Sequence, residues 1–362
     1  MNHITIIAGA RPNFMKVAPI IHEIKKRKAE GVDIDYSLVH TGQHYDKKMS
    51  GDFFEQLNIP EPDANLSAGG GTQAEQAGAI MIRFEEHLMK NPTDLVLVVG
   101  DVTSTMACAI TAQKLHIKVA HVEAGIRSND WTMPEEINRL VTDAITNYFF
   151  TTSEVANKTL RASGYGDDQI FFVGNCMIDT LLANKPRFIR PSIWEELSLN
   201  EKGYFMMTLH RPANVDEGEI LKELMDEIVN NTKDMPLVFP VHPRTKKMLN
   251  ELGIEHERLY MVDPMSYLEF NYLVERSFAV VTDSGGITEE TTVMGVPCLT
   301  LRDNTERPET ITVGTNELIG TNPKNIAPAM KTLFAGEWKK GGIPELWDGK
   351  AASRIIDKLL SL

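Results

Sequence analysis

The stretch DLVLVVGDVTSTMACAITAQKLHIKVAHVEAG, residues 94–125, shows the strand and helix pattern that recurs along the chain. It begins and ends with short runs, 94–101 and 118–125, that are mostly apolar on both faces. Such runs are typical of parallel strands covered by helices on both sides of a sheet. The residues between them, 105–116, carry apolar side chains at helical spacing. The stretch therefore predicts a β-α-β unit.

The same alternation of strand and helix patterns continues along the chain. Further strand patterns lie at 3–9, 35–42 and 147–153, and a second set lies at 203–210, 236–242, 259–264, 278–286 and 297–302. Two such sets predict an α/β protein with two doubly wound, Rossmann-like domains that face a central cleft. We expect the first domain to span residues 1–172 and the second to span 173–338. The last segment, 339–362, is expected to form a helix that packs back on the first domain.

Composition narrows the class of protein. The chain has 362 residues, more than one hydrophobic core usually holds, and its net charge is −13. Nucleic-acid binding requires a basic surface, so we expect no nucleic-acid partner. No apolar run is long enough to span a membrane, and no signal peptide is recognisable, so we expect no membrane partner and a cytoplasmic location. Three widely spaced cysteines, Cys108, Cys176 and Cys298, suggest neither a disulfide framework nor a zinc site.

Polar and charged residues gather where the predicted strands end. In doubly wound sheets, ligands bind beyond the carboxyl ends of the strands, so these positions are the candidate site. The pieces concerned are 9–16, 41–46, 100–105 and 121–127 in the first domain, and 208–214, 240–245, 283–290 and 302–309 in the second.

The stretch VVTDSGGITEETTVMG, residues 280–295, reads as a buried strand, a glycine turn and a helix. Gly285 and Gly286 allow close backbone approach, and the N–H groups at the helix start favour a phosphate. Glu290 lies about one turn further on, where a carboxylate could bind the hydroxyls of a ribose. The alternative is an ordinary helix start in which Ser284 is the cap.

The motifs at the strand ends resemble, in order, those of one family. GARPNFMK, TGQH, HVEAGIRS, MPEEINR, HRPANVD, DSGGITEE and RDNTERPE are similar to the motifs of the non-hydrolysing UDP-N-acetylglucosamine 2-epimerases, and the resemblance runs from residue 9 to about 320. It implies a GT-B fold. It also implies an isomerase that interconverts UDP-N-acetylglucosamine and UDP-N-acetylmannosamine without a metal or a nicotinamide cofactor. The implied route is anti elimination of UDP to 2-acetamidoglucal, followed by re-addition of UDP with C2 protonated on the opposite face. The family is commonly homodimeric.

The resemblance also implies roles for individual residues. The catalytic candidates are Asp101, Glu123, Glu135 and His210. The candidates for binding the substrate and UDP are Arg11, Lys16, His44, Arg139, Arg211, Asn214, His242, Ser284, Gly285, Gly286, Glu290 and Arg307.

Each of these residues has a simpler structural interpretation. Glu135 and Arg139 could form a surface pair on one helix, worth about 0.3–0.5 kcal/mol. Lys16 could face solvent, and Arg307 could form a salt bridge with Glu306 or Glu309.

Other functions remain open at this point. A GT-B glycosyltransferase that uses a UDP-sugar would share the nucleotide site, and a hydrolysing epimerase would release free N-acetylmannosamine. A nucleotide-sugar binding protein without activity is the third alternative. The retained set Asp101, Glu123, Glu135 and His210 argues against the inactive binding protein.

Overall fold

A computed structural model describes residues 2–42, 56–211, 218–241 and 243–362 of the chain. The chain divides into two compact units. The first consists of Met1–Ala183 together with Glu345–Leu362, and the second is Asn184–Pro344. Within the described ranges, none of the helices combines the length and the apolarity that a membrane span requires.

The first unit is built on a seven-stranded parallel sheet in the order β3-β2-β1-β4-β5-β6-β7. The strands are β1 (His3–Ala8), β2 (Asp35–His40), β3 (Ala64–Asn65), β4 (Leu95–Val99), β5 (Lys118–Val122), β6 (Tyr148–Thr151) and β7 (Ile170–Phe172). The strand order reverses between β1 and β4, which makes the sheet doubly wound. The carboxyl ends of β1, β4 and β5 meet at this switch point.

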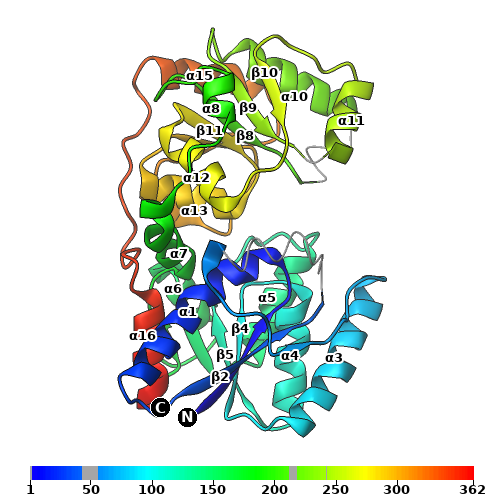
Figure 1. Cartoon of the computed structure of the whole chain (residues 1–362), viewed down its shortest axis with the longest axis vertical. Helices are drawn as coiled ribbons and strands as arrows, with labels where there is room; N and C mark the ends of the chain where they lie inside the picture. Colours follow the sequence, from blue (N-terminus) through cyan, green and yellow to red (C-terminus); the bar gives the residue numbers. More distant parts are fainter. Residues whose placement is uncertain (1, 43–55, 212–217, 242) are drawn as a thin grey trace. The chain divides into compact units, whose positions relative to one another are not determined.

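Helices cover both faces of this sheet. They are α1 (Arg11–Ala29), α3 (Gln73–Lys90), α4 (Thr103–Lys114), α5 (Pro134–Ala144), α6 (Glu154–Ala162), α7 (Cys176–Asn184) and α16 (Ala351–Ser361). Phe84 and Ile80 of α3 are fully buried against Val96 and Val98 of β4, in a cluster that also contains α4. Figure 1 shows α16 (red) lying beside α1 (blue), and these two helices are in contact.

The end of the chain is tied to the first unit by specific bonds. The carboxylate of Asp179, on α7, accepts hydrogen bonds from the N–H groups of Ala351 and Ala352 at the start of α16, at 3.1 and 2.8 Å. Burial raises the pKa of Asp179 to about 6. Arg27 on α1 binds Asp357 on α16 at 2.7 Å. These bonds keep α7 within the first unit, so the division falls after residue 183 rather than after residue 172.

The second unit contains a six-stranded parallel sheet in the order β10-β9-β8-β11-β12-β13. Its strands are β8 (Phe205–Thr208), β9 (Leu237–Pro240), β10 (Leu259–Val262), β11 (Ala279–Thr282), β12 (Cys298–Thr300) and β13 (Asn316–Leu318). Its helices are α8 (Ile193–Glu196), α10 (Gly218–Asn230), α11 (Pro243–Glu251), α12 (Tyr267–Arg276), α13 (Gly285–Met294), α14 (Pro308–Thr312) and α15 (Ile326–Phe334), with short 3-10 turns at Lys185–Arg187 and Pro323–Asn325. The switch point lies between β8 and β11.

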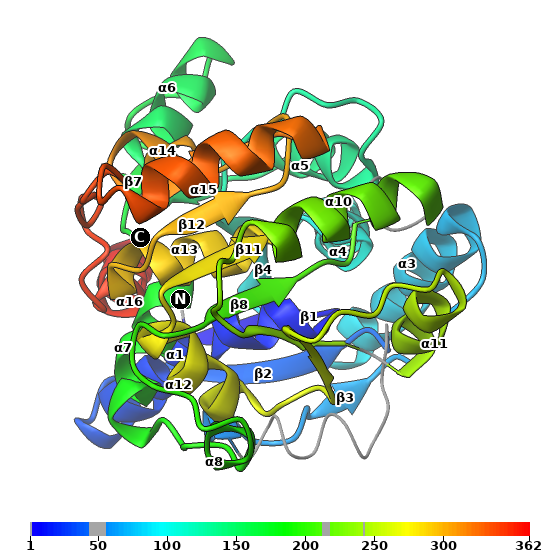
Figure 2. The same ribbon diagram turned by 90° about the horizontal axis from the view of Figure 1, so that it is seen from above.

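Side chains of the second sheet alternate between two buried layers. Phe205 and Met207 join the cluster that includes α10 and α15, whereas Met206, between them, joins the cluster that includes α12. Figure 2 shows α10 and α15 on one face of this sheet and α12 on the other. Burial on both faces explains why these strands read as continuous apolar runs. The α/β class and the two doubly wound sheets are confirmed, whereas the predicted central cleft remains a prediction.

Candidate active site

Asp101 stands at the carboxyl end of β4 and is held from α5. Arg139 donates from Nε and Nη2 to Asp101 Oδ2, at 3.0 and 2.5 Å, and Asn138 donates to the Asp101 carbonyl at 2.9 Å. The Arg139 side chain is 2% exposed, and its Nη1 also binds Glu136 Oε2 at 2.6 Å. Arg139 therefore binds Asp101 and Glu136, and the surface pair between Glu135 and Arg139 is not the arrangement that forms.

Glu123 follows β5 and is paired with a lysine from α1. Its Oε1 lies 2.7 Å from Lys16 Nζ, and both side chains are at least 90% buried. The solvent-facing interpretation of Lys16 is therefore wrong. A Cβ on Gly100 would lie only 2.8 Å from Lys16 Nζ, and Gly100 has φ +65°. The Lys16–Glu123 pair thus lies directly against the Gly100–Asp101 turn.

The backbone of Glu123 is in the left-handed region, at φ +74°. A residue other than glycine or asparagine seldom adopts this conformation, which costs about 1–2 kcal/mol. It persists because neighbouring bonds fix the turn. The N–H groups of Glu123 and Ala124 both donate to Phe150 O, at 2.9 and 3.2 Å. The strained backbone conformation therefore holds the Glu123 side chain in one direction.

The two glutamates at the start of α5 differ in environment. Glu135 is half-buried in the first turn. Glu136 is buried and accepts from the N–H and the hydroxyl of Ser128, from the N–H of Asn129 and from Arg139. Although burial raises the pKa of Glu136, these donors lower it overall. Glu136 thus fixes the loop before α5, a role that the sequence did not reveal.

In the second unit, Asp283 links the ends of β8 and β11. It is fully buried and accepts from the backbone N–H groups of His210 and Arg211, at about 3.1 and 2.9 Å. His210 Nδ1 lies 2.7 Å from Asp283 Oδ1, while the His210 side chain is 61% exposed. Because a carboxylate only accepts, Nδ1 carries the hydrogen of this bond. The bond orients the ring, and Nε2 is the ring nitrogen on the outward side. Arg211 also donates from Nε to the Asp283 carbonyl at 3.1 Å.

The start of α13 keeps its backbone donors available. Ser284 occupies the N-cap position, but its side chain makes no capping hydrogen bond. The simple interpretation of Ser284 as a cap is therefore wrong. Gly285 and Gly286 form the first two helical positions, and a Cβ on Gly285 would come within 2.9 Å of Glu306 Oε1. A helix start with exposed N–H groups and a positive dipole end favours an anion.

Glu290 is buried one turn and a half into α13. Its Oε1 accepts a 2.8 Å hydrogen bond from the Tyr267 hydroxyl of α12. Burial is the largest cause that raises the pKa of Glu290 to about 7, and the charge of Glu289 adds to it. A carboxylate with a raised pKa is stabilised in its ionised form by any ligand that donates hydrogen bonds to it.

Arg307 is 5% exposed and donates from Nε to Glu289 of α13. Glu306 forms a salt bridge with Arg302, at 2.5 Å. Arg307 thus forms a buried salt bridge, and Glu289 is one of its partners.

Four predicted site residues cannot be placed fully. His44, Asn214 and His242 lie outside the described residues. Arg11 is the first residue of α1, and only its backbone is described.

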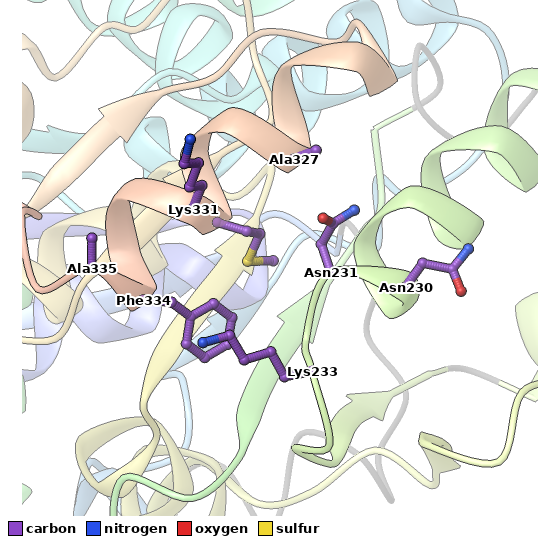
Figure 3. Close-up of a pocket in the computed structure, with 8 residues that line it drawn as sticks. Asn230, Asn231, Lys233, Ala327, Lys331, Phe334 and Ala335 are labelled. Carbon is purple, nitrogen blue, oxygen red and sulfur yellow. The ribbon is translucent and has the colours of Figure 1, made fainter.

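A hollow of about 450 Å³ in the second unit contains none of the predicted site residues (Figure 3). It lies along α15 and beside the end of α10. Lys233 Nζ lies 4.1 Å from the centre of the Phe334 ring in this hollow. Its lining consists of Asn230, Asn231, Lys233, Ala327, Met330, Lys331, Phe334 and Ala335.

Comparison with known proteins places the chain in a family. The profile described as "UDP-N-acetylglucosamine 2-epimerase" matches residues 25–360. The UDP-N-acetylglucosamine 2-epimerase of Methanocaldococcus jannaschii is 40% identical, over 98% of this chain and 97% of that protein. The UDP-2,3-diacetamido-2,3-dideoxy-D-glucuronate 2-epimerase of Pseudomonas aeruginosa is 38% identical, over the full length of both.

A solved structure of a relative has the same fold as this chain. The crystal structure of the M. jannaschii epimerase in complex with UDP-N-acetylglucosamine and UDP matches with a TM-score of 0.89, covering 99% of this chain and 100% of that one. The predicted GT-B class is thereby confirmed. With two Rossmann-like units, acidic side chains at the carboxyl edge of the first sheet and a glycine turn that opens a helix in the second, the chain belongs to the UDP-N-acetylglucosamine 2-epimerase family, a family of isomerases.

Proposed function

We propose that this epimerase interconverts UDP-N-acetylglucosamine and UDP-N-acetylmannosamine by anti elimination of UDP to 2-acetamidoglucal and re-addition of UDP. The observation that carries the proposal is the pair of adjoining turns at the edge of the first sheet, one presenting Asp101 and the other Glu123. Inversion at C2 removes a proton from one face of the sugar ring and returns one to the other face. Two proton carriers held at fixed positions suit that requirement.

In this proposal each carboxylate is oriented by a buried cation. Arg139 donates twice to one oxygen of Asp101, and Lys16 donates to one oxygen of Glu123. Glu135 is the third acidic candidate. Arg139 and Lys16 thereby act through the carboxylates, and each general acid or base contributes roughly 10²–10⁴-fold to the rate.

The second unit is proposed to hold UDP while the C1–O bond breaks. The diphosphate gains charge in that step, and donors aimed at it stabilise the transition state. The N–H groups of Gly285 and Gly286 and the oriented ring of His210 supply such donors, with Arg211 beside them. Glu290 is proposed to accept hydrogen bonds from the ribose hydroxyls. The proposed reaction needs no metal or nicotinamide cofactor.

Incubation with UDP-N-acetylglucosamine in deuterated water tests the proposal. The expected result, measured by NMR, is the formation of UDP-N-acetylmannosamine together with deuterium at C2 of both sugars. Free N-acetylmannosamine would instead indicate hydrolysis. An unchanged substrate that reacts only when an acceptor is added would indicate a glycosyltransferase, and no reaction with any acceptor would indicate a binding protein. UDP-2,3-diacetamido-2,3-dideoxy-D-glucuronate belongs in the same assay, because a relative 38% identical is an epimerase of that sugar nucleotide.

We also propose that the protein is a cytoplasmic homodimer, as the family resemblance implies. Light scattering coupled to size-exclusion chromatography tests the dimer, whose expected mass is twice the 40.5 kDa of one chain. A mass of one chain at micromolar concentration would contradict it.

A further inference from the structure

Asp143, in the last turn of α5, is a buried carboxylate with three donors around it. It is 1% exposed. Its Oδ1 lies 2.8 Å from His121 Nδ1, and its Oδ2 lies 2.6 Å from Arg127 Nη1 and 3.1 Å from the N–H of Gly125. All of these partners belong to β5 or to the turn that follows it. Asp143 therefore fixes the turn that carries Glu123.

His121 extends this network to the neighbouring turn. It lies within β5, is fully buried, and its Nε2 is 2.8 Å from the carbonyl oxygen of Gly100. That carbonyl belongs to the peptide directly before Asp101. The chain Asp143–His121–Gly100 thus connects the Glu123 turn to the Asp101 turn.

Each ring nitrogen of His121 has one hydrogen-bond partner. A carbonyl oxygen only accepts, so Nε2 carries a hydrogen. Asp143 faces the Arg127 guanidinium and a backbone N–H. Although burial raises the pKa of Asp143, its bond with His121 and the charges of His121 and Arg127 lower it overall. An ionised carboxylate also only accepts, so both ring nitrogens of His121 face acceptors.

We propose that Asp143 and the doubly protonated His121 form a positioning pair, which holds the turns of Asp101 and Glu123 at a fixed separation. The inference rests on the proposed function, since it concerns the spacing of the two proton carriers. Neither residue is required to touch the substrate. The strained φ of Glu123 is consistent with this role, because such a conformation persists only where surrounding bonds fix it.

The alternative is a buried ion pair that stabilises the fold and nothing more. Two substitutions of Asp143 separate these roles. Asp143→Asn can keep the hydrogen bonds: its amide donates to Nδ1 of a neutral His121, whose Nε2–H still reaches Gly100. Asp143→Ala removes every bond and lets both turns relax. Asp179→Ala is the matched control, since Asp179 is also buried in the first unit and accepts two backbone N–H groups, but at the start of α16.

We expect Asp143→Ala to lower kcat by roughly 10²-fold or more, the effect of misplacing catalytic groups by about 1 Å. The KM for UDP-N-acetylglucosamine and the Kd for UDP should stay within about threefold, since the second unit is unchanged. Asp143→Asn should keep kcat within about tenfold of the wild type. Asp179→Ala should lower stability but leave kcat of the folded protein within about threefold.

The proposal is overturned if folded Asp143→Ala has a kcat within about threefold of the wild type, or loses no more than Asp179→Ala does. If Asp143→Ala does not fold, the decision rests on Asp143→Asn and on the wild-type protein. A kcat loss in Asp143→Asn as large as that of removing Asp101 would contradict the geometric role. Nitrogen-15 NMR of wild-type His121 at pH 7 should show both ring nitrogens protonated, and one bare nitrogen would contradict the network. A wild-type protein without C2 exchange would refute the proposed function, while the NMR spectrum would still decide the state of His121.

Discussion

Replacing Glu290 by glutamine should stabilise the free protein, and the gain should depend on pH. Burial raises the pKa of Glu290 from the ordinary 4.5 to about 7. The folded state therefore binds more protons than the unfolded state between those two values, and stability falls as the pH rises through that window. At ~1.4 kcal/mol for each pH unit, the raised pKa of Glu290 lowers the free energy of unfolding by about 3 kcal/mol above pH 7, where the group is ionised in both states. At pH 5, where the group is protonated in the folded state, the same effect is about 1 kcal/mol.

Glutamine removes this cost while retaining an oxygen that accepts from the Tyr267 hydroxyl. For a unit of this size, 1 kcal/mol corresponds to roughly 2–4 °C in Tm. Scanning calorimetry of Glu290→Gln should therefore show a rise of roughly 6–12 °C at pH 8 and about 2–4 °C at pH 5. Glu223→Gln, at an exposed position of α10, is the matched control and should change Tm little at either pH.

The same substitution should weaken UDP binding. A hydrogen bond to a charged group is worth about 1.5–3 kcal/mol, so the loss of the carboxylate should raise the Kd of UDP by roughly 10- to 100-fold at pH 8. A Tm gain that is equal at both pH values would show that burial of the charge is not its cause. A lower Tm at pH 8 would refute the reasoning altogether.

Three further substitutions test other contacts of the site. Arg139→Lys loses the paired donors to Asp101 and should lower kcat at least ~10-fold with the Kd of UDP unchanged; an unchanged kcat would exclude the proposed orienting role. Gly100→Ala places a methyl group 2.8 Å from a buried ammonium nitrogen at φ +65°, and should lower the free energy of unfolding by at least ~1–2 kcal/mol, which urea titration can measure. Arg307→Met removes the buried cation that binds Glu289, and the free energy of unfolding should fall by about 3–5 kcal/mol in the same titration. The double variant Arg307→Met with Glu289→Gln should recover part of that loss, and no recovery would contradict the pairing.

The sequence predicted both sheets because their central strands are long apolar runs joined by helical patterns. Three short strands were missed: β3, β7 and β13, each of two or three residues. Runs of that length are too short to show a period, and their pairing depends on the neighbouring strand already being in place. Three of the four edge strands could therefore not be predicted from local pattern alone, whereas the edge strand β10 falls within the predicted run 259–264.

The candidate site was predictable where its residues follow strands, as for Asp101, Glu123 and the Ser284–Gly286 turn. What the sequence did not reveal is which residues hold them. Lys16 and Glu123 bind each other across 107 positions, a pairing that no local pattern records. Asp143 and Tyr267 lie on helices, where a polar side chain is ordinarily expected to face water. Their inward direction depends on how each helix packs on its sheet, which a single sequence does not specify.

The bonds that fasten α16 to α1 and α7 have a consequence during protein synthesis. The second unit is encoded entirely within the first, between residues 183 and 345. At a translation rate of ~5–20 residues per second, the ribosome needs roughly ten to forty seconds after making residue 183 before the last helix exists. The second unit can complete its own sheet on the ribosome in that interval, whereas α1 must wait with its contact face for α16 uncovered. A chain truncated shortly before residue 345 and released from the ribosome should therefore hold a protease-resistant second unit beside a first unit that is still readily cleaved.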